Sequence, residues 1–117
     1  MVTPAAGAVV LAPFPFLDLS QAKLRPAVAL ANSGRGDWIL GQVTSNPYGD
    51  ELAIEMTDAS FDSGALLITS YARPGKLFTA NQELMVKLVG NLNSDALEAI
   101  IEAVITILRG SSATSVQ

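Results

Sequence analysis

The stretch that decides the fold is AVVLAPFPF, residues 8–16, near the start of the chain. Its first five residues, Ala8 to Ala12, form an apolar and β-branched run that is typical of a buried strand. The prolines that follow cannot donate to a central ladder, so we expect the strand to stop there. The chain therefore begins with a buried strand and continues into a long, proline-headed loop from Pro13 to Leu24.

More short strands are predicted beyond this loop, because apolar or alternating runs recur between turn signals such as SGRGD, residues 33–37. The predicted strands cover residues 26–31, 38–44, 52–56, 65–69, 77–79 and 84–91, and residues 58–64 and 71–76 are assigned to turns or loops. Several short strands at close spacing are typical of a small barrel.

A single amphipathic helix is predicted at the end of the chain, over about residues 94–109. Apolar residues from Leu97 to Leu108 recur at the spacing of one helix face. Ser94 or Asp95 is the expected cap, and Gly110 is expected to end the helix. We predict a mainly β protein, a barrel with a C-terminal helix beside it, as one domain over residues 1–110 with a polar tail over 111–117.

The composition excludes several kinds of chemistry. The 117 residues include no cysteine and no histidine, which excludes disulfides, thiolate chemistry, zinc sites built from these residues and histidine acid/base catalysis. We see no credible metal site and expect no cofactor. A positively charged secretory start is missing before Lys23, and the stretch Leu97–Leu108 is shorter than the roughly 20 residues of a membrane helix. We expect a cytoplasmic protein without a membrane partner.

The charge balance is acidic, with eleven Asp and Glu against seven Lys and Arg, a net charge of −4. Nucleic-acid binders usually carry a basic surface instead. Local fields depend on how charges cluster, however, and four of the bases fall in the two short segments Lys23/Arg25 and Arg73/Lys76. If the fold brings these segments together, a basic patch is expected on an acidic protein.

Two strand ends carry candidate phosphate contacts. Arg25 lies at the end of the loop that enters the strand predicted over 26–31, and its planar guanidinium suits a phosphate better than a lysine does. The structural alternative is that Arg25 neutralises Asp18 or Asp37. Thr44 and Ser45 end another strand and offer two adjacent hydroxyls to a phosphate oxygen, although hydroxyls at such positions more often bond the local backbone.

Aromatic side chains near cations are the second kind of candidate, because aromatic rings stack on unpaired bases while cations follow the nucleic-acid backbone. Tyr71 stands beside Arg73 and Lys76, and Phe14 and Phe16 lie in the first loop. The alternatives are an ordinary connection with its tyrosine on the barrel rim, and core packing for at least one of the phenylalanines.

Taken together, these segments resemble the PemK/MazF family of toxins, and especially its branch with a Pro-Phe-Pro-Phe loop. The resemblance runs from about Gly7 to Leu108 in the order of the family. Its landmarks are GAVVLAPFPFLDL (7–19), KLRPAVAL (23–30), QVTS (42–45), residues 61–64, Ser70, Arg73-Pro74, KLFT (76–79), and Gly90 followed by the helix.

The resemblance implies an SH3-like barrel with a C-terminal helix, a homodimer, and a toxin-type endoribonuclease that cleaves single-stranded mRNA and inhibits growth. It implies that Arg25 and Thr44, with Ser45 beside it, are catalytic. It further implies that the loop from Phe14 to Lys23 borders an RNA groove, which a cognate antitoxin protein blocks. We assign RNA binding to six residues: Phe14, Phe16, Lys23, Tyr71, Arg73 and Lys76.

A protein without histidine or metal can cut RNA through the 2′-hydroxyl of the RNA itself, leaving a 2′,3′-cyclic phosphate. Two positions depart from the family pattern: Ala8 follows Gly7 where Gly-Asp is common, and Gly75 stands where many members have an acidic residue. These departures keep two other interpretations open. One is a non-catalytic module on the same barrel, like the related toxins that poison DNA gyrase, and the other is an inactive relative that only pairs with an antitoxin-like protein.

Overall fold

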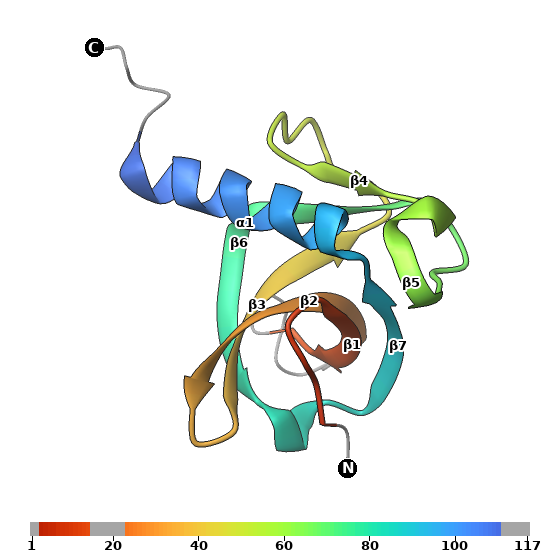
Figure 1. The fold of residues 1–117 in the computed structure, drawn as a ribbon, viewed down its shortest axis with the longest axis vertical. Coiled ribbons are helices and arrows are strands. Elements are labelled where there is room, and N and C mark those ends of the chain that lie inside the picture. Colours follow the sequence, from red (N-terminus) through yellow and green to blue (C-terminus); the bar gives the residue numbers. More distant parts are fainter. Residues whose placement is uncertain (1–2, 15–22, 111–117) are drawn as a thin grey trace.

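The computed structural model describes residues 3–14 and 23–110 of the chain. Within this part of the chain one antiparallel sheet has the strand order β4-β6-β3-β2-β1-β7-β5 (Figure 1). Its strands are β1 (Ala8–Pro13), β2 (Leu24–Gly34), β3 (Asp37–Thr44), β4 (Ile54–Met56), β5 (Phe61–Gly64), β6 (Ser70–Asn81) and β7 (Lys87–Leu92). The 3-10 turns η2 (Asp58–Ser60) and η3 (Gln82–Leu84) and the helix α1 (Ser94–Arg109) complete the elements.

The sheet curls into a half-barrel because its long strands twist and shift register. The β3–β6 ladder pairs Gly41 with Leu77 but Gln42 with Arg73, so three residues of β6 bulge out between the two pairs. Successive residues of β1 face opposite sides of the curled sheet, and Val9 and Val10 accordingly belong to two different apolar clusters. The prediction of a mainly β protein with a C-terminal helix is confirmed.

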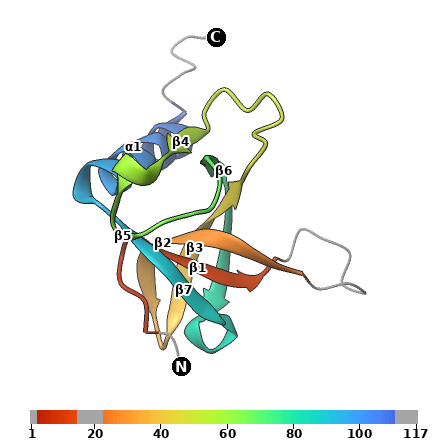
Figure 2. The same ribbon diagram turned by 90° about the vertical axis from the view of Figure 1, so that its right-hand side faces the viewer.

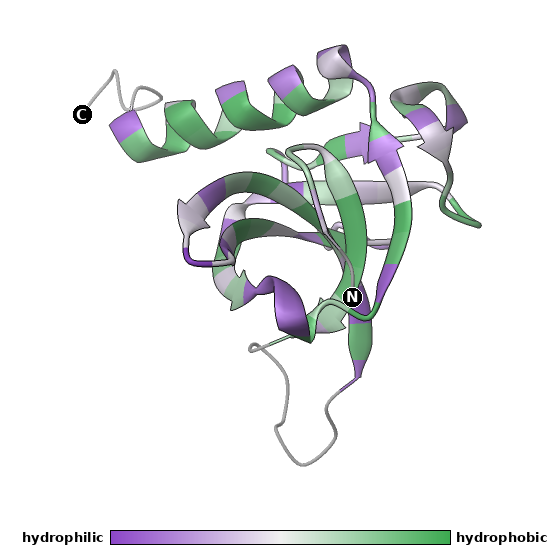
Figure 3. Ribbon diagram, turned by 60° about the horizontal axis from the view of Figure 1, so that its bottom comes forward, coloured by the Kyte–Doolittle hydropathy of each residue, from purple (hydrophilic) through white to green (hydrophobic). Residues whose placement is uncertain are grey.

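Helix α1 covers one of these clusters and lies across β6 and β4 (Figures 1 and 3). Ile100, 1% exposed, is the buried anchor of its apolar face. Asn93 is the N-cap, and its side-chain oxygen accepts a hydrogen bond of 2.8 Å from the Ala96 amide, so the expected cap at Ser94 or Asp95 is one or two residues too late. Gly110 ends the helix at φ 65°, as its sequence position predicts.

Several local predictions differ from the structure. Residues 65–69 form no strand, and their apolar side chains Leu67 and Ile68 are exposed, so their composition does not reflect burial. Residues 71–76 are not a loop but belong to β6, because the bulge at Pro74 to Lys76 removes the proline from the ladder. Residues 58–64 are not merely a turn, since they contain η2 and the short strand β5. The predicted strand over 52–56 shortens to β4.

Two glycines allow β5 and β7 to approach each other closely. Gly64, at φ 70°, pairs with Gly90 in the ladder. A Cβ atom on Gly90 would lie 2.6 Å from the carbonyl oxygen of Ser63, and one on Gly64 would clash with the carbonyl oxygen of Val89. These two positions therefore require glycine, which explains why both belong to the landmarks of the sequence.

Candidate functional site

A cavity of about 690 Å³ is lined by residues from the start of β2, the end of β3 and the segment 65–68 that follows β5. Leu11, Pro26, Val43 and Val89 supply apolar lining from the central strands. The polar lining consists of Arg25, Thr44, Ser45, Tyr48, Ser70 and Lys87. The three residues predicted as catalytic thus reach one cavity.

The cavity forms where two neighbouring strands part. The pairing of β2 with β3 ends at Ala27 and Gln42. Beyond that pair, the start of β2 continues along β1, whereas the end of β3 continues along β6 (Figure 2). Arg25 lies two residues before Ala27 on β2, and Thr44 lies two residues after Gln42 on β3. They therefore lie on the two sides of the opening.

The charge of the cavity is opposite to that of the chain. Its lining includes the cations Arg25 and Lys87 and, among the described residues, no aspartate or glutamate. Both side chains are exposed, and neither pairs with a carboxylate of the described residues. Asp37, one suggested partner of Arg25, instead accepts a hydrogen bond of 3.1 Å from the Asn81 amide group. The arrangement can hold an anion, because two unpaired cations face a partly apolar wall.

The hydroxyl of Thr44 makes the local bonds that hydroxyls at strand ends usually make. Its Oγ1 donates to the carbonyl oxygen of Asn46 at 3.0 Å and accepts from the Asn46 amide at 3.2 Å. Ser45 is exposed and makes no hydrogen bond within the described residues. Of the two adjacent hydroxyls, that of Ser45 has its donor and acceptor capacity free, while that of Thr44 also shapes the loop above the cavity.

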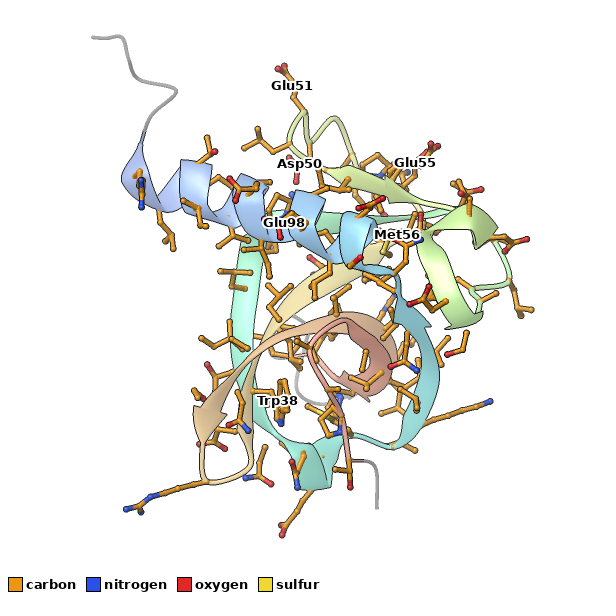
Figure 4. The ribbon with its side chains drawn as sticks, in the orientation of Figure 1. Trp38, Asp50, Glu51, Glu55, Met56 and Glu98 are labelled. Atoms are coloured by element: carbon orange, nitrogen blue, oxygen red, sulfur yellow. The ribbon has the colours of Figure 1, made fainter. Side chains whose placement is uncertain are left out.

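Arg73 and Asp50 form an ion pair next to the cavity, with 2.8 Å between Nε and Oδ2. The hydrogen bond from Arg73 lowers the pKa of the Asp50 carboxyl; the Leu52 amide and the charge of Arg73 act in the same direction, against partial burial. Asp50 lies at the base of the β3–β4 loop, whereas Glu51 at its tip points away from the protein (Figure 4). Arg73 therefore holds the loop and does not line the cavity.

The remaining predicted RNA contacts are dispersed. The ring of Phe14 is only 3% exposed and packs edge-on against Phe78 with 5.2 Å between ring centroids. Phe14 is therefore a residue of the core. Lys23 is exposed at the start of β2. Tyr71 and Lys76 belong to β6 and are not part of the cavity lining. Phe16 lies outside the described residues, as does Asp18.

Sequence reasoning missed two residues of the cavity, Lys87 and Tyr48. Lys87 begins β7, opposite Leu11 in the β1–β7 ladder. Tyr48 lies in the turn after the Thr-Ser strand end, in the left-handed backbone region at φ 53°. The Asn46-Pro47-Tyr48-Gly49 turn signal was the one available hint for Tyr48, because turn residues position side chains at loop tips.

The described residues contain no cluster of three or more aspartates and glutamates that are placed to share a metal ion. In the same part of the chain no helix has both the length and the apolar character needed to cross a membrane.

No family model matches the sequence, and no curated protein sequence matches it significantly. Solved structures do match its fold. MazF from Deinococcus radiodurans superimposes with a TM-score of 0.72 at 18% identity, over 93% of this chain and 99% of that chain. An endoribonuclease in complex with its cognate antitoxin, from a mycobacterial species, gives 0.69 at 15% identity, over 93% and 96%. The Mycobacterium tuberculosis toxin MazF-mt6 gives 0.67 at 14% identity, over 87% and 96%. The chain has the fold of the MazF toxins.

Proposed function

We propose that this chain, which folds like the MazF toxins, is itself a toxin-type endoribonuclease that cleaves single-stranded RNA. The proposal rests on one observation, the cavity that Arg25, Thr44 and Ser45 all line. Lys87 adds a second cation there, and the described lining is free of carboxylates although the chain carries a net charge of −4. An acidic protein that keeps one cationic, partly apolar cavity is suited to a polyanion whose bases are unpaired.

The proposed reaction uses the 2′-hydroxyl of the RNA as nucleophile. The 2′-oxygen attacks the adjacent phosphorus, a 2′-O–P bond forms, and the bond from phosphorus to the 5′-oxygen of the next nucleotide breaks. The 2′-hydroxyl proton goes to solvent and the departing 5′-oxygen takes a proton from water, so the products are a 2′,3′-cyclic phosphate and a 5′-hydroxyl. The protein has to orient the chain and stabilise the charge on the phosphate oxygens.

Each residue of the cavity has a distinct task in this proposal. Arg25 stabilises the non-bridging oxygens of the transition state through its paired N–H groups. Ser45 donates to one of these oxygens, and Thr44 holds the end of β3 in place while it faces the same phosphate. Lys87 binds a flanking phosphate, and Lys23, exposed two residues before Arg25, binds the next one along the chain. Tyr71 and Lys76, on β6 away from the lining, are left for more distant RNA contacts.

The proposed partners are a second copy of the chain and an antitoxin protein. The support is the shared fold, because one of the similar mycobacterial endoribonucleases was solved with its cognate antitoxin. A segment of such a partner with carboxylates and apolar side chains suits the cavity, since cations and apolar groups both line it.

The proposal is tested by incubating the purified protein with a labelled single-stranded RNA in EDTA. We expect cleavage that leaves cyclic-phosphate ends, and no cleavage of the matching single-stranded DNA, which lacks the nucleophile. Absence of RNA cleavage by a folded protein that still binds RNA would overturn the assigned reaction. Absence of both cleavage and RNA binding would favour the non-catalytic module, and inhibition of purified gyrase is the assay for that outcome.

A further inference from the structure

Tyr48 is the exposed aromatic side chain of the cavity rim. It is 76% exposed and lines the cavity, whereas Phe14 and Trp38 are buried and the other described aromatics are half-buried. This large exposed ring lines the same cavity as Arg25 and Lys87, which form no ion pair within the described residues. The same ring is well suited to stack on a nucleic-acid base, which binds through its flat face irrespective of its sequence.

The backbone of the β3–β4 loop sets the position of this ring. The side-chain oxygen of Asn46 accepts a hydrogen bond of 2.9 Å from the Tyr48 amide, and the Asp50 amide donates to the carbonyl oxygen of Pro47 at 2.9 Å. These bonds hold Tyr48 at φ 53°, a conformation that a bulky residue adopts only at a cost. Thr44 in turn bonds the backbone of Asn46, so the loop is tied to the strand end that contributes to the cavity.

A second tie comes from the neighbouring strand. Arg73 of β6 reaches Asp50, and the other carboxylate oxygen of Asp50 accepts from the Leu52 amide at 3.0 Å. The two side chains of the ion pair are 22% and 15% exposed, so the pair is only partly exposed to solvent. The loop that carries Tyr48 is therefore anchored at both of its ends, by Thr44 before the tyrosine and by Arg73 after it.

We propose that Tyr48 stacks on one base of the bound RNA next to the scissile phosphate, and that the Arg73–Asp50 ion pair positions it for this contact. The inference rests on the proposed function and deepens it, because it names the residue that contacts an unpaired base of the substrate. Arg73 thereby becomes a positioning residue in place of the direct RNA contact that its sequence suggests.

The test is an abasic scan in which binding is separated from cleavage. Each position of a labelled single-stranded oligonucleotide with 2′-fluoro sugars, which cannot be cleaved, is replaced in turn by an abasic unit. Affinity is measured by fluorescence anisotropy. With the parent protein, one position should lose affinity by roughly 5- to 100-fold when its base is removed. With Tyr48→Leu, removal of the base at that position should no longer change the affinity, while the effects at all other positions stay the same. Tyr48→Phe keeps the ring face and should behave like the parent.

The ion pair is tested with Asp50→Asn and Arg73→Gln, with Arg35→Gln at the exposed β2–β3 turn as the matched arginine control. Asp50→Asn and Arg73→Gln should both reduce the loss of affinity that follows removal of the base at this position. The double variant should have no larger effect than either single variant, and Arg35→Gln should leave the affinity profile unchanged. A purely structural role would instead lower affinity at every position equally.

The outcomes separate this inference from the proposed reaction. If Tyr48→Leu keeps the sensitivity of the abasic position, or lowers affinity uniformly, the stacking role is wrong even where RNA cleavage persists. If the position-specific effect depends on Tyr48 but the parent protein cleaves no RNA, the reaction is wrong and the stacking role stands. An oligonucleotide that does not bind at all rejects the stacking role, and absence of RNA cleavage in addition rejects the reaction.

Discussion

Arg25 at the start of β2 and Thr44 at the end of β3 line the same cavity from two strands whose mutual pairing has just ended, at Ala27 and Gln42. A continuous ladder would bring neighbouring side chains within about 5 Å and leave no room between them. The parting of the strands creates a space that a phosphate group can enter. The same parting keeps the cation and the hydroxyl on fixed elements, which is what a site for charge stabilisation requires.

Replacement of Arg25 by alanine should reduce RNA cleavage on the order of 100-fold or more, because one charge-stabilising donor contributes roughly 3 kcal/mol to the transition state. Arg25→Lys should cleave faster than Arg25→Ala but more slowly than the parent, since lysine keeps the charge but lacks the paired N–H groups. Single-turnover cleavage rates provide the measurement. The matched control is Arg35→Ala at the β2–β3 turn, which should cleave at the parental rate; parental activity in Arg25→Ala would reject the catalytic assignment.

Thr44 and Ser45 should separate in their effects on stability. Thr44→Val removes a hydroxyl that bonds Asn46 twice, so we expect a loss of about 1 kcal/mol in the free energy of unfolding together with slower cleavage. Ser45→Ala removes an exposed hydroxyl that has no hydrogen-bond partner among residues 3–14 and 23–110, and it should slow cleavage with no change in stability. Urea denaturation and cleavage assays on both variants measure the two quantities. Equal stability losses would mean that Ser45 also bonds the loop.

The sequence predicted the elements whose apolar pattern is strong. Strands β1, β2 and β3 follow from short apolar runs between turn signals, and the helix over 94–109 follows from apolar residues at the spacing of one helix face. Residues 65–69 were misassigned because their apolar side chains border the cavity and remain exposed, a situation that composition does not distinguish from burial. β6 was divided because Pro74 suggests a break, whereas a bulge accommodates it.

The candidate site was only partly predictable for a related reason. Arg25 directly precedes one predicted strand, and Thr44 and Ser45 lie at the end of another; a sequence pattern locates such positions well. Lys87 enters the cavity only because β7 pairs with β1, and this pairing joins residues far apart in the chain. The Arg73–Asp50 pair spans 23 residues, so no local pattern indicated that Arg73 anchors a loop. A basic patch was expected only if the fold brought Lys23/Arg25 and Arg73/Lys76 together. The cations that line the cavity are instead Arg25 and Lys87.

The Asp50–Arg73 pair should make stability depend on pH in the acid range. The pKa of Asp50 is lowered below its ordinary value of 3.8, chiefly by the hydrogen bond from Arg73. The unfolded chain therefore takes up the proton first, and the contribution of the pair is complete above about pH 5 and is lost as the pH falls through the lower, folded-state pKa. Because the pair is partly exposed, we expect a contribution of about 1 kcal/mol or less.

The measurement is the melting temperature of the parent and of Asp50→Asn between about pH 3 and pH 7. The variant should be less stable at neutral pH and should converge with the parent at the acid end. Glu51→Gln, which alters the neighbouring exposed carboxylate at the loop tip, is the control and should show no such convergence. A constant difference at every pH would mean that the carboxylate charge of Asp50 contributes nothing to folding.

Gly90 should not tolerate a side chain, whereas Gly75 should. A methyl group on Gly90 would come within 2.6 Å of the Ser63 carbonyl oxygen and 2.9 Å of the Phe61 ring, so β5 would have to move. We expect Gly90→Ala to lower the free energy of unfolding by about 1–3 kcal/mol. At Gly75 the nearest atom is the Cδ1 of Ile107 at 3.8 Å, an ordinary contact, and Gly75→Ala should be neutral or stabilising by up to about 1 kcal/mol. Chemical denaturation of the two alanine variants compares them directly. If Gly90→Ala is tolerated as well as Gly75→Ala, the β5–β7 approach is looser than the pairing of Gly64 with Gly90 implies. If Gly90→Ala destabilises as expected, the movement of β5 should also reshape the cavity through residues 65–68, which follow it in the chain.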